Sequence, residues 1–150
     1  MIQFWMLLAT TLILSVAGNL NTAAASDYPI TGAWAYVQSN APQLQDKACQ
    51  AFRRLGLAKV SGEAIGGGEL IVFDGAKRHN FGGYADDVTP NISIRKLSDN
   101  SFDVIDRWIS DGEGGIRPGP RKKQYNLKIV DPNTIEIREK RYPAARYVRC

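Results

Sequence analysis

The stretch from residue 73 to residue 87 holds the side chains best suited to acid–base chemistry. His79 is the only histidine of the chain, and an imidazole transfers protons near neutral pH when a carboxylate such as Asp86 or Asp87 orients it. No serine, cysteine or lysine nucleophile stands in a recognisable elbow, and the Asp-Gly pair at 74 and 75 is a hairpin signal. We therefore expect a non-enzymatic protein with no catalytic residues, and keep a hydrolase centred on His79 as an alternative. The candidate loop site comprises Arg78, His79, Asp86 and Asp87.

A second group of side chains suits the binding of anions. Residues 117–150 hold 10 Lys and Arg against 3 Asp and Glu, whereas residues 26–116 hold 9 against 12. The candidate basic surface is the outward face of one predicted hairpin, which carries Lys122, Lys128, Arg138 and Lys140. Its partner would be a protein or an anionic envelope component, although such charges also keep a sheet soluble. Nucleic acid is not expected, because this face lacks aromatic side chains for base stacking.

The glycine- and proline-rich segment 111–120 leads into a cationic run, a composition that phosphate-binding loops share. Such a loop is followed by a helix N-terminus. A strand pattern follows here, so we interpret the segment as the connection of a long hairpin. The acidic residues do not fit the twelve-residue calcium loop, and two cysteines with one histidine do not make a zinc site. We expect no metal and no cofactor.

The N-terminal segment predicts export. The first 25 residues carry no charged side chain, the run from Met6 to Gly18 is apolar, and small residues at 23–25 fit a cleavage site after about Ala25. An apolar core of about 13 residues is short for a membrane span, which needs about 20. We therefore expect a secreted or periplasmic protein, with residues 1–25 as signal peptide, residues 26–150 as a single domain, and no integral membrane span after cleavage.

The two cysteines, Cys49 and Cys150, are expected to form one disulfide in an oxidising compartment. A bridge that closes a loop of about 100 residues would stabilise the fold by ~4 to 5 kcal/mol on the chain-entropy model. It would also hold the last strand in place.

Hydrophobic spacing predicts one helix over about 41–55. Apolar residues recur at steps of four and three from Leu44 to Leu55. Asn40 stands three residues before Gln43, as in a capped helix start, and Gly56 can end the helix. Strands are expected at about 30–36, 69–73, 92–97, 102–110, 122–130, 134–140 and 145–149.

Alternation of apolar and polar residues is clearest late in the chain. A symmetric hairpin around residues 131–133 would set Lys128 opposite Glu136 and Leu127 opposite Ile137. The strand 102–110 carries apolar residues on both faces, so we expect both to be covered, one of them by the helix. Asp106 in that strand would then need a partner, for which we expect one of the late arginines.

One helix with so many short strands predicts a mainly β (α+β) fold. We expect a small antiparallel β-barrel, or a strongly curved sheet, with the helix packed on it and covering an open end or edge. A closed barrel is favoured because it leaves no exposed strand edge.

The Gly-Ala-Trp sequence at 32–34 resembles the Gly-x-Trp opening of lipocalin-like (calycin) barrels, which include small bacterial inhibitors of secreted metalloproteases. The resemblance implies that Trp34 closes the base of the barrel. With Trp108, it is expected to be a packing residue.

These observations favour a binding module that acts through its loop rim or its basic outer face. One alternative is an inhibitor of a secreted protease, in which the segment 26–29 inserts into the active-site cleft. Another is a carrier of a small apolar ligand, although the bulky inward residues would rather fill a small barrel. The sequence leaves the oligomeric state open.

Overall fold

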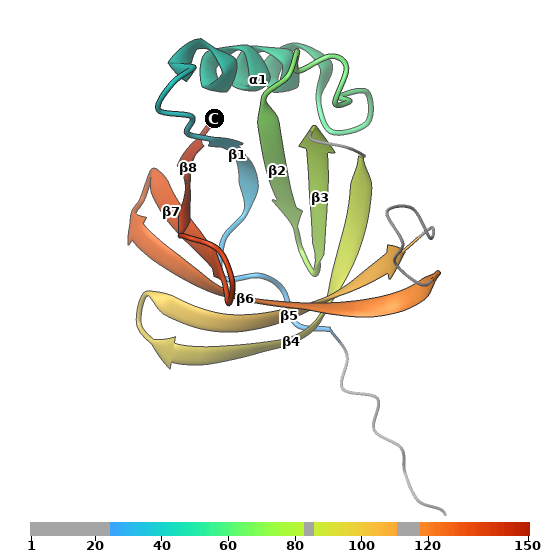
Figure 1. The fold of residues 1–150 in the computed structure, drawn as a ribbon, viewed down its shortest axis with the longest axis vertical. Coiled ribbons are helices and arrows are strands. Elements are labelled where there is room, and N and C mark those ends of the chain that lie inside the picture. The colour runs from blue at the N-terminus through green and yellow to red at the C-terminus, as the bar shows by residue number, and fades with distance from the viewer. Residues whose placement is uncertain (1–24, 83–85, 111–117) are drawn as a thin grey trace, which may run out of the picture.

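The computed structural model describes residues 25–82, 86–110 and 118–150, so the predicted signal peptide and most of the segment 111–120 lie outside the described residues. The described residues form one helix and eight strands, which close into an antiparallel barrel (Figure 1). The strands are β1 (Gly32–Tyr36), β2 (Glu69–Asp74), β3 (Lys77–Gly82), β4 (Asp87–Ser98), β5 (Ser101–Ser110), β6 (Gly119–Asp131), β7 (Thr134–Glu139) and β8 (Ala145–Arg149). The helix α1 (Pro42–Leu55) lies between β1 and β2 in the chain.

Each strand pairs with the next one in sequence, and β8 returns to pair with β1. The predicted barrel is therefore confirmed. The β6–β7 hairpin has the predicted register, with Lys128 opposite Glu136 and Leu127 opposite Ile137. The pairing of Ser110 with Gly119 confirms that β5 and β6 form a hairpin across the glycine-rich segment.

Two strands differ from the expectation. The strand β3 was not predicted, because its sequence KRHNFG has no apolar alternation. The strand β4 begins at Asp87, five residues before the predicted start at Ile92, and it includes Pro90. Most of the stretch predicted as a loop site is therefore sheet.

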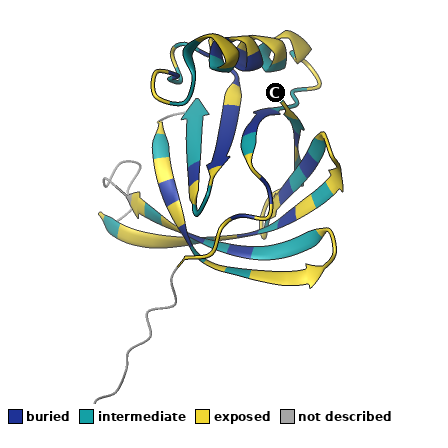
Figure 2. Ribbon diagram, turned by 180° about the vertical axis from the view of Figure 1, so that it is seen from behind, coloured by how far each residue is buried: buried dark blue, intermediate teal, exposed yellow. Residues whose placement is uncertain are grey.

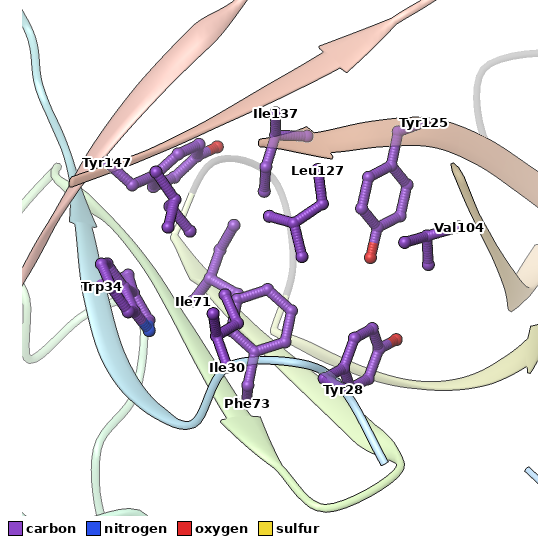
Figure 3. Packing of buried hydrophobic residues seen from close by; sticks show 11 residues of the cluster. Tyr28, Ile30, Trp34, Ile71, Phe73, Val104, Tyr125, Leu127, Ile137 and Tyr147 are labelled. Atoms are coloured by element: carbon purple, nitrogen blue, oxygen red, sulfur yellow. The ribbon is translucent and has the colours of Figure 1, made fainter. Parts of the chain in front are cut away.

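Alternate residues of the strands fill the barrel. The inward side chains form one buried cluster, shown in Figure 3, that comprises Tyr28, Ile30, Trp34, Ile71, Phe73, Val104, Tyr125, Leu127, Ile135, Ile137 and Tyr147. Trp34 is 1% exposed and belongs to this cluster. Its indole Nε1 donates to the Thr31 carbonyl at 3.1 Å, and the guanidinium of Arg149 lies over its ring at 4.3 Å.

The helix packs on the outer face of β1 and β2, with its buried residues toward the barrel (Figure 2). Small side chains on both elements, such as Ala35 and Ala48, let the helix approach closely. A Cβ atom at Gly68 would lie 2.9 Å from the carbonyl oxygen of Leu44, so the approach depends on glycine there. The expectation that the helix packs on the barrel is confirmed, but the expectation that it covers the strand β5 is wrong, because its main packing partners among the described strands are β1 and β2.

The start of the helix differs from the prediction, whereas its end agrees with it. The N-cap residue is Ala41, and no side-chain cap bond is made at this described start, so the predicted pairing of Asn40 with Gln43 is wrong. Pro42 in the first turn supplies a fixed backbone angle instead. Gly56 ends the helix as predicted, and its N–H donates to the carbonyl of Phe52 at 2.8 Å.

The disulfide between Cys49 and Cys150 is confirmed. It ties the helix to the residue that follows β8, across 101 positions of sequence. Two further bonds support this link, because the Nε and Nη2 atoms of Arg53 donate to the Cys150 carbonyl at 3.2 and 2.9 Å. A disulfide fits an oxidising compartment. No helix in the described part of the chain has the length and apolar character to cross a membrane.

Residues 25–30, which we call the strap, cross the barrel end at the β2–β3 turn. The N–H of Tyr28 donates to the Gly75 carbonyl at 2.9 Å, and the Asn91 side chain donates to the Ser26 carbonyl at 2.6 Å. Tyr28 and Ile30 are buried in the interior cluster. The strap therefore closes this end of the barrel and leaves the opposite end as the place for a site.

Candidate functional site

A polar cluster lies within the apolar interior of the barrel. Asp106 is fully buried, and its two carboxylate oxygens accept hydrogen bonds from the hydroxyls of Tyr28 at 2.6 Å and Tyr125 at 2.9 Å. Arg78, also buried, places its Nη1 atom 3.6 Å from Asp106 and its guanidinium 4.9 Å from the centre of the Tyr125 ring. Figure 3 shows Tyr28 and Tyr125 together at one side of the interior cluster, beside Val104.

Strand register explains why these residues meet. Arg78 pairs with Thr89, Asn91 pairs with Asp106, and Val104 pairs with Tyr125. All of these positions point into the barrel and are buried. The prediction that a late arginine partners Asp106 is wrong, because β3 supplies the arginine instead.

Burial and the neighbouring polar groups shift the pKa values in this cluster. Burial raises the pKa of Asp106 above the ordinary carboxyl value, against the opposing effects of Tyr28, Arg78 and Tyr125. Burial also raises the pKa values of Tyr28 and Tyr125, so both phenols stay neutral and donate hydrogen bonds. Burial lowers the pKa of Arg78, but Tyr125 and Asp106 raise it by more, and the side chain stays a cation.

From this cluster a chain of polar contacts runs outward. The Nε atom of Arg78 donates to the side-chain oxygen of Asn80 at 2.7 Å, and Asn80 in turn donates to Asp87. The hydroxyl of Thr89 donates to the Arg78 carbonyl at 3.3 Å. The Nη1 atom of Arg78 is buried and makes no hydrogen bond to any described residue. A buried donor without an acceptor costs about 1–3 kcal/mol, so an acceptor placed beside this atom would stabilise the arrangement of the described residues.

The outward path ends in a hollow of about 1000 Å³. The hollow lies at the barrel end where β2, β4 and β6 begin and β3, β5 and β7 end. We call this hollow the mouth of the barrel. The cations along its described wall are Arg78, Arg121, Lys122, Lys123, Lys140 and Arg141, and the carboxylates are Glu69, Asp87 and Glu139. The large apolar or aromatic side chains are Leu70, Ile71, Phe81, Trp108, Ile137, Tyr142 and Tyr147.

Charge among the described residues of the mouth is unbalanced toward the positive. Lys123 pairs with Glu139 at 2.8 Å, and Asp87 accepts the hydrogen bond from Asn80. The described cations still outnumber the carboxylates by six to three. A hollow with an excess of one sign of charge and partly apolar walls attracts ligands of the opposite sign.

The four residues of the predicted basic surface are divided by the structure. All four are exposed, but Lys122 and Lys140 border the mouth, whereas Lys128 and Arg138 lie outside its lining. Lys128 stands opposite Glu136, and Arg138 opposite Asn126, farther along the β6–β7 wall. Trp108 also lines the mouth, so it is a wall residue and not part of the packed interior.

The predicted loop site does not assemble as a catalytic pair. His79 shares the outer face with its partner Val72, and its ring stacks on Phe81 with the ring centres 6.4 Å apart. The carboxylate of Asp86 accepts hydrogen bonds from the N–H of Gly62 at 2.9 and 2.8 Å.

The other acidic candidate, Asp87, accepts a hydrogen bond from Asn80, its pairing partner on β3. Asn80 faces the barrel interior, whereas His79, the residue before it, faces outward. The pairing of His79 with either carboxylate is therefore not observed. Of the four predicted loop-site residues, Arg78 and Asp87 belong to the mouth.

The partners of Arg78 escaped prediction for different reasons. Tyr28 precedes the first expected strand, and Asn80 lies in the strand that the pattern does not show. Only Tyr125 carried a signal, because it shares the predicted inner face with Leu127. A buried Arg in the polar stretch KRHNFG has no signature in the local sequence.

Within the described residues, no three His, Cys, Asp or Glu side chains come together as a metal-binding group. Comparisons of the chain with protein-family models, with curated proteins and with solved structures find no match. The resemblance to lipocalin-like barrels is therefore supported only at the level of an eight-stranded antiparallel barrel. Function has to be inferred from the mouth and its chemistry.

Proposed function

We propose that the protein is an exported, non-enzymatic binding protein that takes an anionic ligand into the mouth of its barrel. The observation that carries this proposal is the hollow of about 1000 Å³, whose described lining has an excess of cations and includes the buried Arg78, whose Nη1 atom makes no hydrogen bond. Its volume lies at the upper end of the range for small-molecule sites.

The mouth supports an anion over a purely apolar ligand. The apolar interior is occupied by the side chains of the buried cluster, whereas the hollow has a mixed polar and apolar wall. An uncharged apolar ligand would leave the Nη1 atom of Arg78 without a hydrogen-bond acceptor. Two residues of the expected basic face, Lys122 and Lys140, border the mouth, which is compatible with anion binding there.

The inhibitor alternative meets a cost in this fold. Insertion of residues 26–29 into a protease would require Tyr28 to leave the interior and give up its bond to Asp106. The mouth, in contrast, is available without any change in the strap. We therefore favour ligand binding.

The test compares two aromatic probes of opposite charge, 2-naphthoate and 2-naphthylmethylammonium, by titration calorimetry of the oxidised protein purified after export. Binding of the anion alone is expected, and its affinity should fall as salt is raised. The double variant Lys122→Gln/Lys140→Gln should weaken binding of the anion.

The matched control is Lys128→Gln/Arg138→Gln, which removes two charges from the wall outside the mouth. It should leave binding nearly unchanged. Equal binding of the two probes, or equal weakening by the two double variants, would contradict a cationic mouth as the site.

A further inference from the structure

We propose that Arg78 anchors the ligand, and that the ligand is a small organic carboxylate whose apolar body lies along the mouth wall at Ile71, Ile137 and Tyr147. This inference rests on the proposed binding function and adds to it the class of ligand and its orientation. In this arrangement the carboxylate accepts the hydrogen bond that Arg78 Nη1 lacks.

The position of Arg78 supports an anchoring role. Its side chain is 6% exposed, yet it belongs to the wall of the hollow, so it forms the inner limit of the mouth. Its Nε atom is engaged by Asn80, and Nη1 stays without a hydrogen bond among the described residues. The guanidinium is thereby fixed in orientation while one donor remains available, which lowers the entropy cost of binding.

Asp106 does not already satisfy this donor. Its distance of 3.6 Å from Nη1 is too long for a hydrogen bond. Both of its oxygens instead accept the hydroxyls of Tyr28 and Tyr125. The carboxylate of Asp106 thus holds the arginine electrostatically from within the barrel and leaves its Nη1 atom without a hydrogen bond.

The surroundings of Arg78 favour a singly charged group over a phosphate. Asp87 and Glu69 line the same hollow and would repel a second negative charge. The nearby polar groups of Asn80 and Thr89 already make hydrogen bonds to Asp87 and to the Arg78 backbone. A phosphate, with three terminal oxygens, would find too few donors at this depth.

The neighbouring wall provides the contact for an apolar body. Ile71, Ile137 and Tyr147 are each buried in the interior cluster and also line the hollow. Trp108 faces the same hollow and is only half buried. A flat or branched hydrocarbon group attached to the carboxylate would cover these side chains while its outer end reaches the rim.

The experiment measures the affinity of the oxidised, exported protein for benzoate, 2-naphthoate and decanoate. Two comparison probes, 2-naphthamide and 2-naphthyl phosphate, share the body of 2-naphthoate. At least one carboxylate should bind about tenfold or more tightly than the amide and the phosphate. Tighter binding of the phosphate would overturn the carboxylate assignment. If none of the charged probes binds, both this inference and the proposed function fail.

Variants test the role of Arg78 itself. The first variant is Arg78→Gln, which leaves Asp106 buried without its cation and can therefore fail to fold. The second variant is Arg78→Met/Asp106→Asn, which removes both charges. The double variant should fold, as circular dichroism and thermal unfolding will report. It should lose about tenfold or more in carboxylate affinity, and its weak affinity for 2-naphthamide should stay unchanged.

The matched control is Arg95→Gln, which removes an arginine that pairs with Asp103 on the outer wall at 3.0 Å. It should bind every probe as the unchanged protein does. Carboxylate binding that survives in the Arg78 double variant but falls in Lys122→Gln/Lys140→Gln would refute the anchoring role and leave the cationic mouth intact.

Discussion

The hydroxyl of Tyr28 provides a sharp test of how the barrel is closed. We expect Tyr28→Phe to lower the free energy of unfolding, because it removes the 2.6 Å hydrogen bond from the strap to Asp106. The change leaves the aromatic ring in place, including its edge contact with Phe73, whose ring centre lies 4.8 Å away. The effect therefore isolates one hydrogen bond.

The magnitude follows from burial and charge. Tyr28 is 4% exposed and Asp106 is fully buried, so water does not replace the lost donor. A hydrogen bond to a charged partner contributes about 1.5–3 kcal/mol, and we expect a loss near the middle of that range. With an unfolding entropy of about 2.1 cal/mol/K per residue over some 125 residues, roughly 2 kcal/mol lowers Tm by about 8 °C.

The assay is thermal and denaturant unfolding of the oxidised protein at neutral pH. The matched control is Tyr142→Phe, which deletes the same hydroxyl from a residue that is 67% exposed. The control should unfold like the unchanged protein. A double-mutant cycle of Tyr28→Phe with Asp106→Asn should show coupling of about 1 kcal/mol or more, because the two groups are in direct contact.

Two results would refute this reasoning. Equal stability of Tyr28→Phe and the unchanged protein would mean that the strap contributes nothing through its hydroxyl. Additive effects in the cycle would mean that the loss arises elsewhere than at Asp106.

Three further predictions concern the scaffold. Replacing Cys49 and Cys150 together by Ala should lower the free energy of unfolding in denaturant by ~4 kcal/mol, and reducing agent should then affect only the unchanged protein. Gly82→Ala should cost at least ~2 kcal/mol, because Gly82 has a φ of 92° and an added Cβ would lie 2.2 Å from the Gly68 carbonyl oxygen; an unchanged Tm would contradict the close approach. Because burial raises the folded-state pKa of Asp106, the folded protein binds its proton more tightly than the unfolded chain. The stability that protonated Asp106 contributes should be complete below about pH 3.9 and should decline as pH rises through the raised folded-state pKa. The variant Asp106→Asn should lack this decline. Parallel profiles of unfolding free energy against pH for the two proteins would contradict this prediction.

The architecture could be predicted well where local patterns carry it. The alternation from Tyr125 to Ile129 identified both the strand and its inner face, and the turn that follows fixed the register with β7. The two cysteines left one simple pairing, which the structure contains. The strand register depends on residues that are close in sequence, and the disulfide follows because two cysteines allow only one intramolecular pairing.

The site could be predicted only in fragments. Arg78 and Asp87 were recognised as candidates, but they were grouped with His79, which alternation places on the opposite face of β3. The sequence also treated Lys122 and Lys128 as one surface, although only Lys122 borders the mouth. Strand alternation, once β3 is known, separates these residues at once.

By itself, the sequence determined the class of fold, the helix, the sulfur bridge and the uneven charge, since each follows from local spacing or composition. Only the tertiary structure decided that the side chains at 28, 78, 106 and 125 meet inside the barrel and that a cationic hollow opens beside them. The physical reason is barrel closure. It sets inward residues of distant strands side by side, and it buries an arginine whose immediate neighbours in the sequence, Lys77 and His79, are polar.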